Sequence, residues 1–167
     1  MYSIRQATIS DAEIIRSIAE ETWQVAYLPI LGTEQISYML NDIYSIEKLT
    51  HQIKNNIQTF LLLIEDGQPV AFAAYSPRAE NADIYKLHKL YCLPVTQGKG
   101  YGKILMGVVI DAVLKAGKHT LELNVNRYNK AKTFYEKMGF TVIYEEDIPI
   151  GPYFMNDYVM RKELKDI

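Results

Sequence analysis

The sequence predicts an α/β fold of the α+β kind, with a mixed, mostly antiparallel central sheet of about seven strands flanked by helices. Short runs in which apolar and polar residues alternate indicate strands, and runs with apolar residues every three or four positions indicate helices. Asp66-Gly67 between two β-rich runs is typical of a hairpin, whereas a strand–helix–strand order over residues 83–125 indicates one parallel pair. The expected order is β-α-α-α-β-β-β-α-β-α-β-β.

The N-terminal part is expected to hold one strand and three helices. The strand spans residues 2–8, and Ser10-Asp11 is expected to cap a helix whose apolar positions repeat every 3.6 residues. A second helix is expected at Thr33–Leu40. Ser45 is expected to open a third helix, which runs to about Asn55.

Three β-rich runs follow, at Ile57–Ile64, Pro69–Ser76 and Asp83–Leu93. The first two are joined by the Asp-Gly turn and form the expected hairpin. In the third run, Leu87 and Leu90 lie three positions apart, although residues on one face of a regular strand lie two or four apart. We therefore expect a β-bulge near residues 88–90.

The C-terminal part is expected to hold two helices and three strands. The first helix carries apolar residues from Leu105 to Ala116 on one face and stops at Gly117, and the second ends at Gly139. The strands are expected at Leu121–Val125, Phe140–Glu146 and Phe154–Arg161, with a turn around Pro149, Gly151 and Pro152 between the last two.

Composition limits the classes of protein that the chain can belong to. Its 167 residues contain no linker or repeat, which predicts a single domain over residues 1–167. The net charge of −2 gives no basic footprint for nucleic acid, and no apolar run is long enough to span a membrane. A single cysteine, Cys92, and an N-terminus without an apolar signal segment favour the cytoplasm. Three scattered histidines and one cysteine give no metal-ligand spacing, so we expect no metal site.

The segment Gln97–Lys103 reads Gln-Gly-Lys-Gly-Tyr-Gly-Lys and lies directly before an expected helix. Its glycines leave backbone N–H groups unshielded, and a helix N-terminus adds partial positive charge, so the segment suits a phosphate or diphosphate. A Walker loop is excluded because Ile104 stands where Ser or Thr is needed, and a dinucleotide fingerprint is excluded because Lys103 stands where a glycine is needed. A tight turn at a glycine-rich helix start is the structural alternative.

Three motifs together resemble one family. Gln97, Gly100 and Gly102 match the pattern Gln/Arg-x-x-Gly-x-Gly/Ala, Phe134–Phe140 matches Phe-Tyr-x-x-x-Gly-Phe, and Leu121–Val125 reads Leu-x-Leu-x-Val. In these motifs the chain resembles the GCN5-related N-acetyltransferases (the GNAT superfamily), and the resemblance covers nearly the whole chain. It implies that family's fold, with a splayed cofactor cleft. It also implies an enzyme that moves an acetyl group from the cosubstrate acetyl-CoA to a primary amine of a small molecule by direct attack on the thioester.

The resemblance also implies the site residues. Tyr135 matches the position of the general acid that protonates the leaving thiolate, although an aromatic residue on an apolar helix face usually just packs. Relatives place a pantetheine-binding asparagine where Tyr128 stands, so Asn129 is the favoured contact and Asn126 the alternative. Lys99 and Lys103 are either point charges for the diphosphate or surface lysines. The cofactor-binding residues are expected to be Leu90, Tyr91, Cys92, Gln97, Gly98, Lys99, Gly100, Tyr101, Gly102, Lys103 and Asn129.

The general base stays open in the sequence. An imidazole ordinarily titrates near neutrality, so His88 is one candidate, although a lone histidine in a strand is more often structural. Glu122 on the neighbouring strand is the second candidate, and a solvated strand face explains it as well. Cys92 is expected to be a small core or pocket residue rather than a nucleophile, because no companion histidine motif exists.

The acceptor is the larger unknown. Glu20–Trp23, Tyr44–Leu49 and Asp157–Leu164 resemble the branch with the bacterial spermidine/spermine acetyltransferases. A polyamine would need carboxylates, for which Glu20, Glu21, Asp157 and the run Glu145–Asp147 are candidates. A catalytically silent acyl-CoA-binding module, a domain that keeps the fold only for protein interaction, and acetylation of a peptide N-terminus are the alternatives. We expect a small-molecule amine as partner, no nucleic acid and no membrane, and a homodimer is one candidate assembly.

Overall fold

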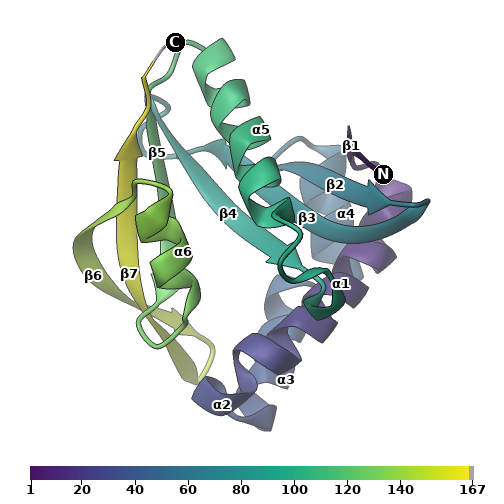
Figure 1. Ribbon diagram of the computed structural model, residues 1–167. Helices are drawn as coiled ribbons and strands as arrows, with labels where there is room; N and C mark the ends of the chain where they lie inside the picture. Colours follow the sequence, from purple (N-terminus) through teal and green to yellow (C-terminus); the bar gives the residue numbers. More distant parts are fainter. Residues whose placement is uncertain (166–167) are drawn as a thin grey trace. The chain divides into compact units, whose positions relative to one another are not determined.

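The computed structural model describes residues 1–165, and Figure 1 shows its helices and strands. The chain forms two compact units. The first unit comprises Met1–Tyr75 and Lys89–Met106, and the second comprises Ser76–His88 and the chain from Gly107 onward. The expectation of one N-acetyltransferase domain over residues 1–167 stays a prediction, and its last two positions, 166 and 167, lie outside the described residues.

Seven strands of residues 1–165 form one sheet in the order β1-β2-β3-β4-β5-β7-β6 (Figure 1). The strands are β1 Tyr2–Gln6, β2 Thr59–Glu65, β3 Gln68–Pro77, β4 Ile84–Cys92, β5 Thr120–Asn126, β6 Thr141–Ile150 and β7 Tyr153–Glu163. β4 and β5 run parallel, whereas β1 and β2, β2 and β3, β5 and β7, and β6 and β7 are antiparallel. The predicted mixed, mostly antiparallel sheet is therefore confirmed.

The α-helices of the described chain are α1 Ala12–Ala26, α2 Leu28–Leu31, α3 Thr33–Ile43, α4 Ile46–Lys54, α5 Tyr101–Lys115 and α6 Ala131–Lys137. Ser45 opens α4 as predicted, because its Oγ accepts a hydrogen bond from the backbone N–H of Lys48 at 3.1 Å. The single turn of α2 was not predicted, and the proline near its start suits a first helical turn. No helix within residues 1–165 has the length and apolar character that crossing a membrane requires.

The predicted hairpin turn lies at Asp66-Gly67, between β2 and β3. Both residues have positive φ, 49° for Asp66 and 82° for Gly67. This pair of left-handed conformations is what a type I′ turn requires, and Asp-Gly adopts it at low cost. Glu65 and Gln68 pair across the turn, so local turn chemistry sets the register of the two strands.

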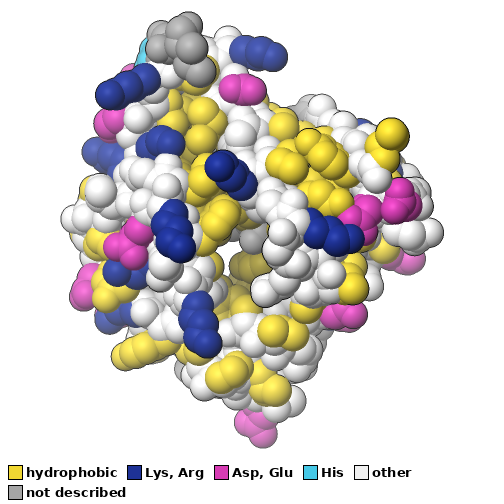
Figure 2. Space-filling model, in the orientation of Figure 1, with side chains coloured by type: hydrophobic (Ala, Val, Ile, Leu, Met, Phe, Trp, Pro, Cys, Tyr) yellow, Lys and Arg dark blue, Asp and Glu magenta, His cyan; other side chains and the backbone are white. Residues whose placement is uncertain are grey.

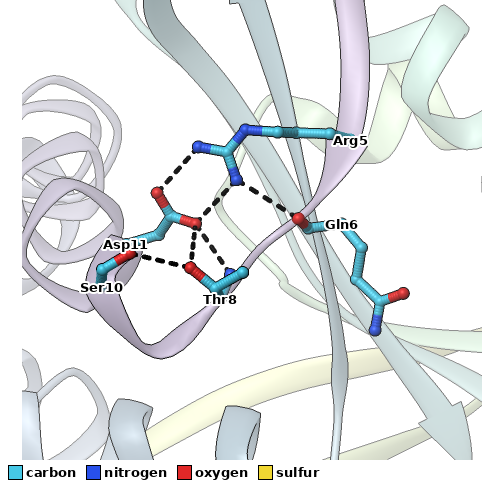
Figure 3. A network of polar contacts seen from close by, with 5 residues as sticks. All are labelled: Arg5, Gln6, Thr8, Ser10 and Asp11. Atoms are coloured by element: carbon cyan, nitrogen blue, oxygen red, sulfur yellow. Dashed lines mark hydrogen bonds and ion pairs between the residues drawn. The ribbon is translucent and has the colours of Figure 1, made fainter.

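The expected cap at Ser10-Asp11 is wrong in its detail. A short 3₁₀ turn at Ile9–Asp11 precedes α1, and the Asp11 carboxylate forms no direct cap of α1. Instead it accepts hydrogen bonds from the backbone N–H of Thr8 at 2.8 Å and from both terminal nitrogens of Arg5 at 2.8 and 2.9 Å (Figure 3). The Arg5 guanidinium lowers the pKa of Asp11 to about 2. The bidentate pair therefore ties β1 to the segment that starts α1.

The expected turn around Pro149 is also wrong, because β6 continues through Pro149 to Ile150. Pro149 pairs with Phe154, and the chain turns only at Gly151 and Pro152. β6 is an edge strand, since it lies at one end of the sheet order. A proline lacks a backbone N–H, and an edge strand tolerates this because one side of it has no partner strand.

Aromatic rings form much of the core of the first unit. Trp23 of α1 is 2% exposed, and its ring centroid lies 4.6 Å from that of Tyr27, 5.9 Å from Tyr44 and 6.4 Å from Tyr91. Phe72 of β3 lies 5.8 Å from Tyr91 and is fully buried. These tilted and edge-to-face contacts pack α1 against the strands and fix the end of β4 that leads into the glycine loop.

Candidate active site

The glycine loop, Gln97–Lys103, lies between β4 and α5, and α5 begins within it at Tyr101. Gly98 and Gly100 have φ of 85° and 76°, which residues with a Cβ rarely adopt. A Cβ added at either glycine would meet no other atom within 4 Å, so the space beside the loop is open. The first N–H groups of an α-helix have no intrahelical acceptor. The loop therefore fits a diphosphate group on its open side.

Glu65 binds two side chains of the glycine loop, those of Lys99 and Tyr101. Lys99 Nζ lies 2.7 Å from Glu65 Oε2, and the Tyr101 hydroxyl donates to the same oxygen. Hydrogen bonds from Lys99 and Tyr101 lower the pKa of Glu65, and the same contact raises the pKa of Tyr101 to about 12. Sequence reasoning missed Glu65, since its partners lie more than thirty positions away in the chain. Lys99 thus serves first as an anchor of the loop.

The end of β4 carries Leu90, Tyr91 and Cys92, all half-buried. Burial raises the pKa of the Cys92 thiol to about 11, so it is a neutral thiol at physiological pH, in line with the expected core or pocket role. After Leu87, the next buried residue of β4 is Lys89, whose Nζ lies 2.7 Å from Gln58 Oε1. A lysine rather than a leucine therefore occupies the next inward position, and the β-bulge near residues 88–90 stays a prediction.

Tyr135 lies on α6 and is only 9% exposed. Its ring centroid lies 5.3 Å from that of Phe134 and 6.1 Å from that of Phe140, both in edge-to-face geometry. Packing is thus one role of this residue, as the sequence allowed, and it fixes the direction of the ring. The role of its hydroxyl as an acid stays a prediction.

The two candidate asparagines differ in their surroundings. Asn126 is 3% exposed; its Oδ1 accepts from the backbone N–H of Tyr128 at 3.0 Å, and its Nδ2 lies 3.3 Å from Met155 Sδ. Asn129 is half-buried, and its Oδ1 accepts from the backbone N–H of Ala131 at 2.9 Å, at the start of α6. Asn126 therefore supports the turn between β5 and α6. Asn129 stays the predicted pantetheine contact.

One face of β4, β5, β7 and β6 in the second unit is polar. Directly paired residues of neighbouring strands share a face, and the register pairs Lys86 with Glu122, Glu122 with Arg161, Asn126 with Asp157, and Asp157 with Glu146. The apolar residues of β5 alternate onto the opposite face. The polar face therefore carries Lys86, Glu122, Asn124, Asn126, Glu146, Asp157 and Arg161.

The structure separates the two candidate bases. Glu122 is 3% exposed; its Oε1 accepts from Arg78 Nε at 2.7 Å and its Oε2 from Arg161 Nε at 2.7 Å. The solvated strand face considered for Glu122 is therefore wrong, and both of its oxygens already bind guanidinium groups. His88 Nε2 lies 2.7 Å from Ser76 Oγ and is half-buried. A base role for His88 stays a prediction.

Asp157 is the second buried carboxylate of the polar face, at 5% exposure. Its Oδ2 accepts from Asn124 Nδ2 at 3.2 Å, whereas its Oδ1 is buried without a hydrogen-bond partner among residues 1–165. Burial raises the pKa of Asp157 to about 6, although Asn124 and the charges of Lys86 and Arg127 oppose the rise. A buried carboxylate that is only half satisfied is uncommon.

A pocket of about 500 Å³ is lined by residues of α1 and α3, among them Glu20 and Glu21. Arg16 Nε lies 2.7 Å from Glu20 Oε1 and compensates its charge. Glu21 is in no ion pair with the described residues. Of the two carboxylates suggested here from the sequence, Glu21 is thus the one that could balance a bound cation.

Charged side chains elsewhere bear on the ligand class. Lysine and arginine side chains are spread over the face of the second unit that carries α6 (Figure 2), which favours an anionic ligand there. No group of three or more His, Cys, Asp or Glu side chains in the described part of the chain could hold a metal ion.

Comparison with known proteins agrees with these features. The acetyltransferase (GNAT) domain family matches residues 27–155. An uncharacterized N-acetyltransferase of Mycobacterium tuberculosis is 29% identical over 157 residues, which cover 93% of this chain and 99% of the relative. A spermidine N(1)-acetyltransferase of Thermoplasma acidophilum is 31% identical over 144 residues, which cover 83% of this chain and 88% of the relative.

Among solved structures, the PaiA N-acetyltransferase of Thermoplasma acidophilum in complex with coenzyme A is similar to this chain. The TM-score is 0.84 at 29% sequence identity, and the match covers 98% of this chain and 99% of the other. The fold, the glycine loop and the family match all lead to the same conclusion. The chain belongs to the GNAT acetyltransferase family, as its motifs indicate, and is an acetyl-CoA-dependent N-acetyltransferase.

Proposed function

We propose that the protein acetylates a primary amine of a small, cationic molecule of the polyamine type. The observation that carries this proposal is the 31% identity with a spermidine N(1)-acetyltransferase over most of both chains. Two carboxylates that form no ion pair with residues 1–165 support a cationic acceptor: Glu21 in the pocket of α1 and α3, and Asp157 on the polar face. The same proposal includes that this chain belongs near the branch of the bacterial spermidine/spermine acetyltransferases.

Acetyl-CoA would be held mainly by backbone groups. The N–H groups around Gly98 and Gly100 would bind its diphosphate, and Lys103, which is exposed, would add a positive charge. The backbone of Leu90–Cys92 would bind the pantetheine arm and polarise the thioester carbonyl, with Asn129 as a further contact. This assignment needs no side-chain charge from Lys99, which Glu65 already binds.

The transfer would proceed by direct attack on the thioester. The neutral amine nitrogen attacks the carbonyl carbon, the C–N bond forms, and the C–S bond breaks with its electron pair on sulfur. The Tyr135 hydroxyl would give its proton to the leaving thiolate and regain one from solvent, while the amine loses its extra proton to a base or an ordered water. His88 is the candidate base, since guanidinium groups bind both oxygens of Glu122.

An amine panel tests the proposal. Purified protein is assayed with acetyl-CoA and spermidine, 1,4-diaminobutane, free amino acids, an aminoglycoside and a peptide that begins with alanine. We expect turnover of the polyamines above the others. Exclusive turnover of the peptide would instead establish N-terminal acetylation. Binding of acetyl-CoA without turnover of any amine would indicate a silent module.

Substitution of Tyr135 tests the acid. Tyr135→Phe keeps the ring packing and removes only the hydroxyl, so kcat should fall roughly 10²–10⁴-fold while the Kd of acetyl-CoA stays unchanged. Tyr38→Phe, which removes an exposed hydroxyl from α3, is the matched control. Unchanged kcat in Tyr135→Phe would leave the residue with a packing role only.

A further inference from the structure

The polar face of the second unit holds two buried carboxylates whose surroundings differ. Glu122 binds two arginines, with three guanidinium contacts of 2.5–2.7 Å to its two oxygens. Such a fully paired buried charge has a structural explanation within the chain. Asp157 lies on the same face, is equally buried, and receives one amide hydrogen bond in place of two guanidinium groups.

The charged groups that face Asp157 come from three other segments. Lys86 of β4 and Arg127 favour its carboxylate form, while Glu146 of β6, its register partner, opposes it. Within residues 1–165, none of these cations approaches Asp157 to the 4.0 Å of an ion pair, and Arg127 is bound to Asp147 at 2.7 Å. Asp157 Oδ1 therefore lacks the partner that a buried carboxylate requires.

The burial of Lys86 also indicates that Asp157 Oδ1 has no cationic partner on this face among the described residues. Desolvation is the main cause that lowers the pKa of Lys86, and repulsion by Arg78 adds to it. Lys86 therefore already bears a cost as a cation on this face, and it leaves Asp157 Oδ1 without a hydrogen bond. A cation for that oxygen is thus expected from outside the chain.

We propose that Asp157 binds the protonated amino group of the acceptor, with Oδ1 as the receiving oxygen and Asn124 holding Oδ2 in place. The proposal rests on the proposed function, because it names the residue that selects a cationic amine. A primary alkylammonium has three N–H donors and a full charge, and it would satisfy Oδ1 as Arg78 and Arg161 satisfy Glu122. The adjacent carboxylate of Glu146 adds negative charge and favours a diamine over a monoamine.

Calorimetry on the protein saturated with coenzyme A tests this assignment. The probes are 1,4-diaminobutane and spermidine, with neutral 1,4-butanediol as the uncharged analogue. We expect Asp157→Asn to weaken binding of both amines roughly tenfold or more and to leave the Kd of coenzyme A unchanged. Asp111→Asn is the matched control, since it removes an exposed carboxylate from α5 of the same protein.

The pH dependence separates a binding role from a structural one. Protonation of Asp157 should weaken amine binding as the pH falls through about 6, and Asp157→Asn should abolish that dependence. If Asp157→Asn binds the amines as tightly as the wild type, or shows the same pH profile, the assignment of Asp157 is overturned. Acetylation of amines by the wild type would still leave the proposed function standing in that case. Absence of both binding and acetylation of every amine in the wild type overturns the two together.

Discussion

Replacement of Asp157 by asparagine should make the protein more stable at neutral pH. The carboxyl has a pKa of about 6 in the folded protein against an ordinary value of 3.8, mainly because it is buried. One pKa unit corresponds to 1.36 kcal/mol, so the buried charge costs about 3 kcal/mol of unfolding free energy at neutral pH. The asparagine amide has its own N–H groups to satisfy, which costs about 1 kcal/mol. We expect a net gain of about 2 kcal/mol.

The sign of the pH dependence follows from the same pKa values. A folded-state pKa above the unfolded one means that the folded protein binds more protons between about pH 4 and pH 6. The wild type therefore loses stability as the pH rises through this window, and Asp157→Asn does not. By the same figures, Asp157→Asn should be less stable than the wild type by about 1 kcal/mol near pH 3, where only the cost of the amide remains, and more stable by about 2 kcal/mol near pH 7.

Thermal and urea unfolding followed by circular dichroism measure this difference. For a chain of this length, a gain of about 2 kcal/mol corresponds to a rise in Tm of roughly 4–8 °C. A loss of stability in Asp157→Asn at neutral pH would refute the reasoning. It would mean that Lys86 or Arg127 pairs with Asp157 in solution, because removal of one partner of a buried ion pair costs about 3–5 kcal/mol.

Three other substitutions test the remaining features. Gly100→Ala should raise the Kd of acetyl-CoA, measured by calorimetry, roughly tenfold, because a Cβ would enter the open side of the glycine loop. Gly117→Ala is the control: Gly117 lies beyond α5 with a similar φ of 78°, so this variant should lose similar stability without a change in Kd. Asp11→Asn should lose about 1–2 kcal/mol of unfolding free energy at neutral pH, measured by urea unfolding. The difference from the wild type should fade as the pH falls from about 4 to 2, because the lowered pKa of Asp11 contributes stability only where the carboxyl is ionised. A difference that does not depend on pH would contradict this. Glu122→Gln should lose about 3 kcal/mol by the same assay, since it leaves two arginines without their carboxylate, and a neutral effect would show that the pair contributes little.

Features set by local chemistry could be predicted from the sequence. The turn at Asp66-Gly67, the cap at Ser45 and the helix end at Gly117 each depend on residues a few positions apart. The glycine loop belongs to the same class, since its positive φ values follow from its own residues. These elements therefore appear where the pattern places them.

Features set by distant partners could not be predicted. Pro149 indicates a turn by composition, but it lies within β6 because that strand is at the edge of the sheet, which only the strand order reveals. Glu122 alternates with apolar residues as a solvent-facing residue would, yet Arg78, just after β3, and Arg161 of β7 both bind it. The role of Glu65 could not be predicted either, because its partners Lys99 and Tyr101 lie 34 and 36 positions away in the sequence.

Trp23 is the chain's one tryptophan, and it lies in the first unit within a cluster of tyrosine rings. An indole shielded from water emits at short wavelength, and neighbouring phenols pass absorbed light to it. Tryptophan emission will therefore monitor the first unit alone, since the second contains tyrosines but no indole. Emission and ellipticity curves that fail to coincide on heating would reveal that the two units melt in separate steps.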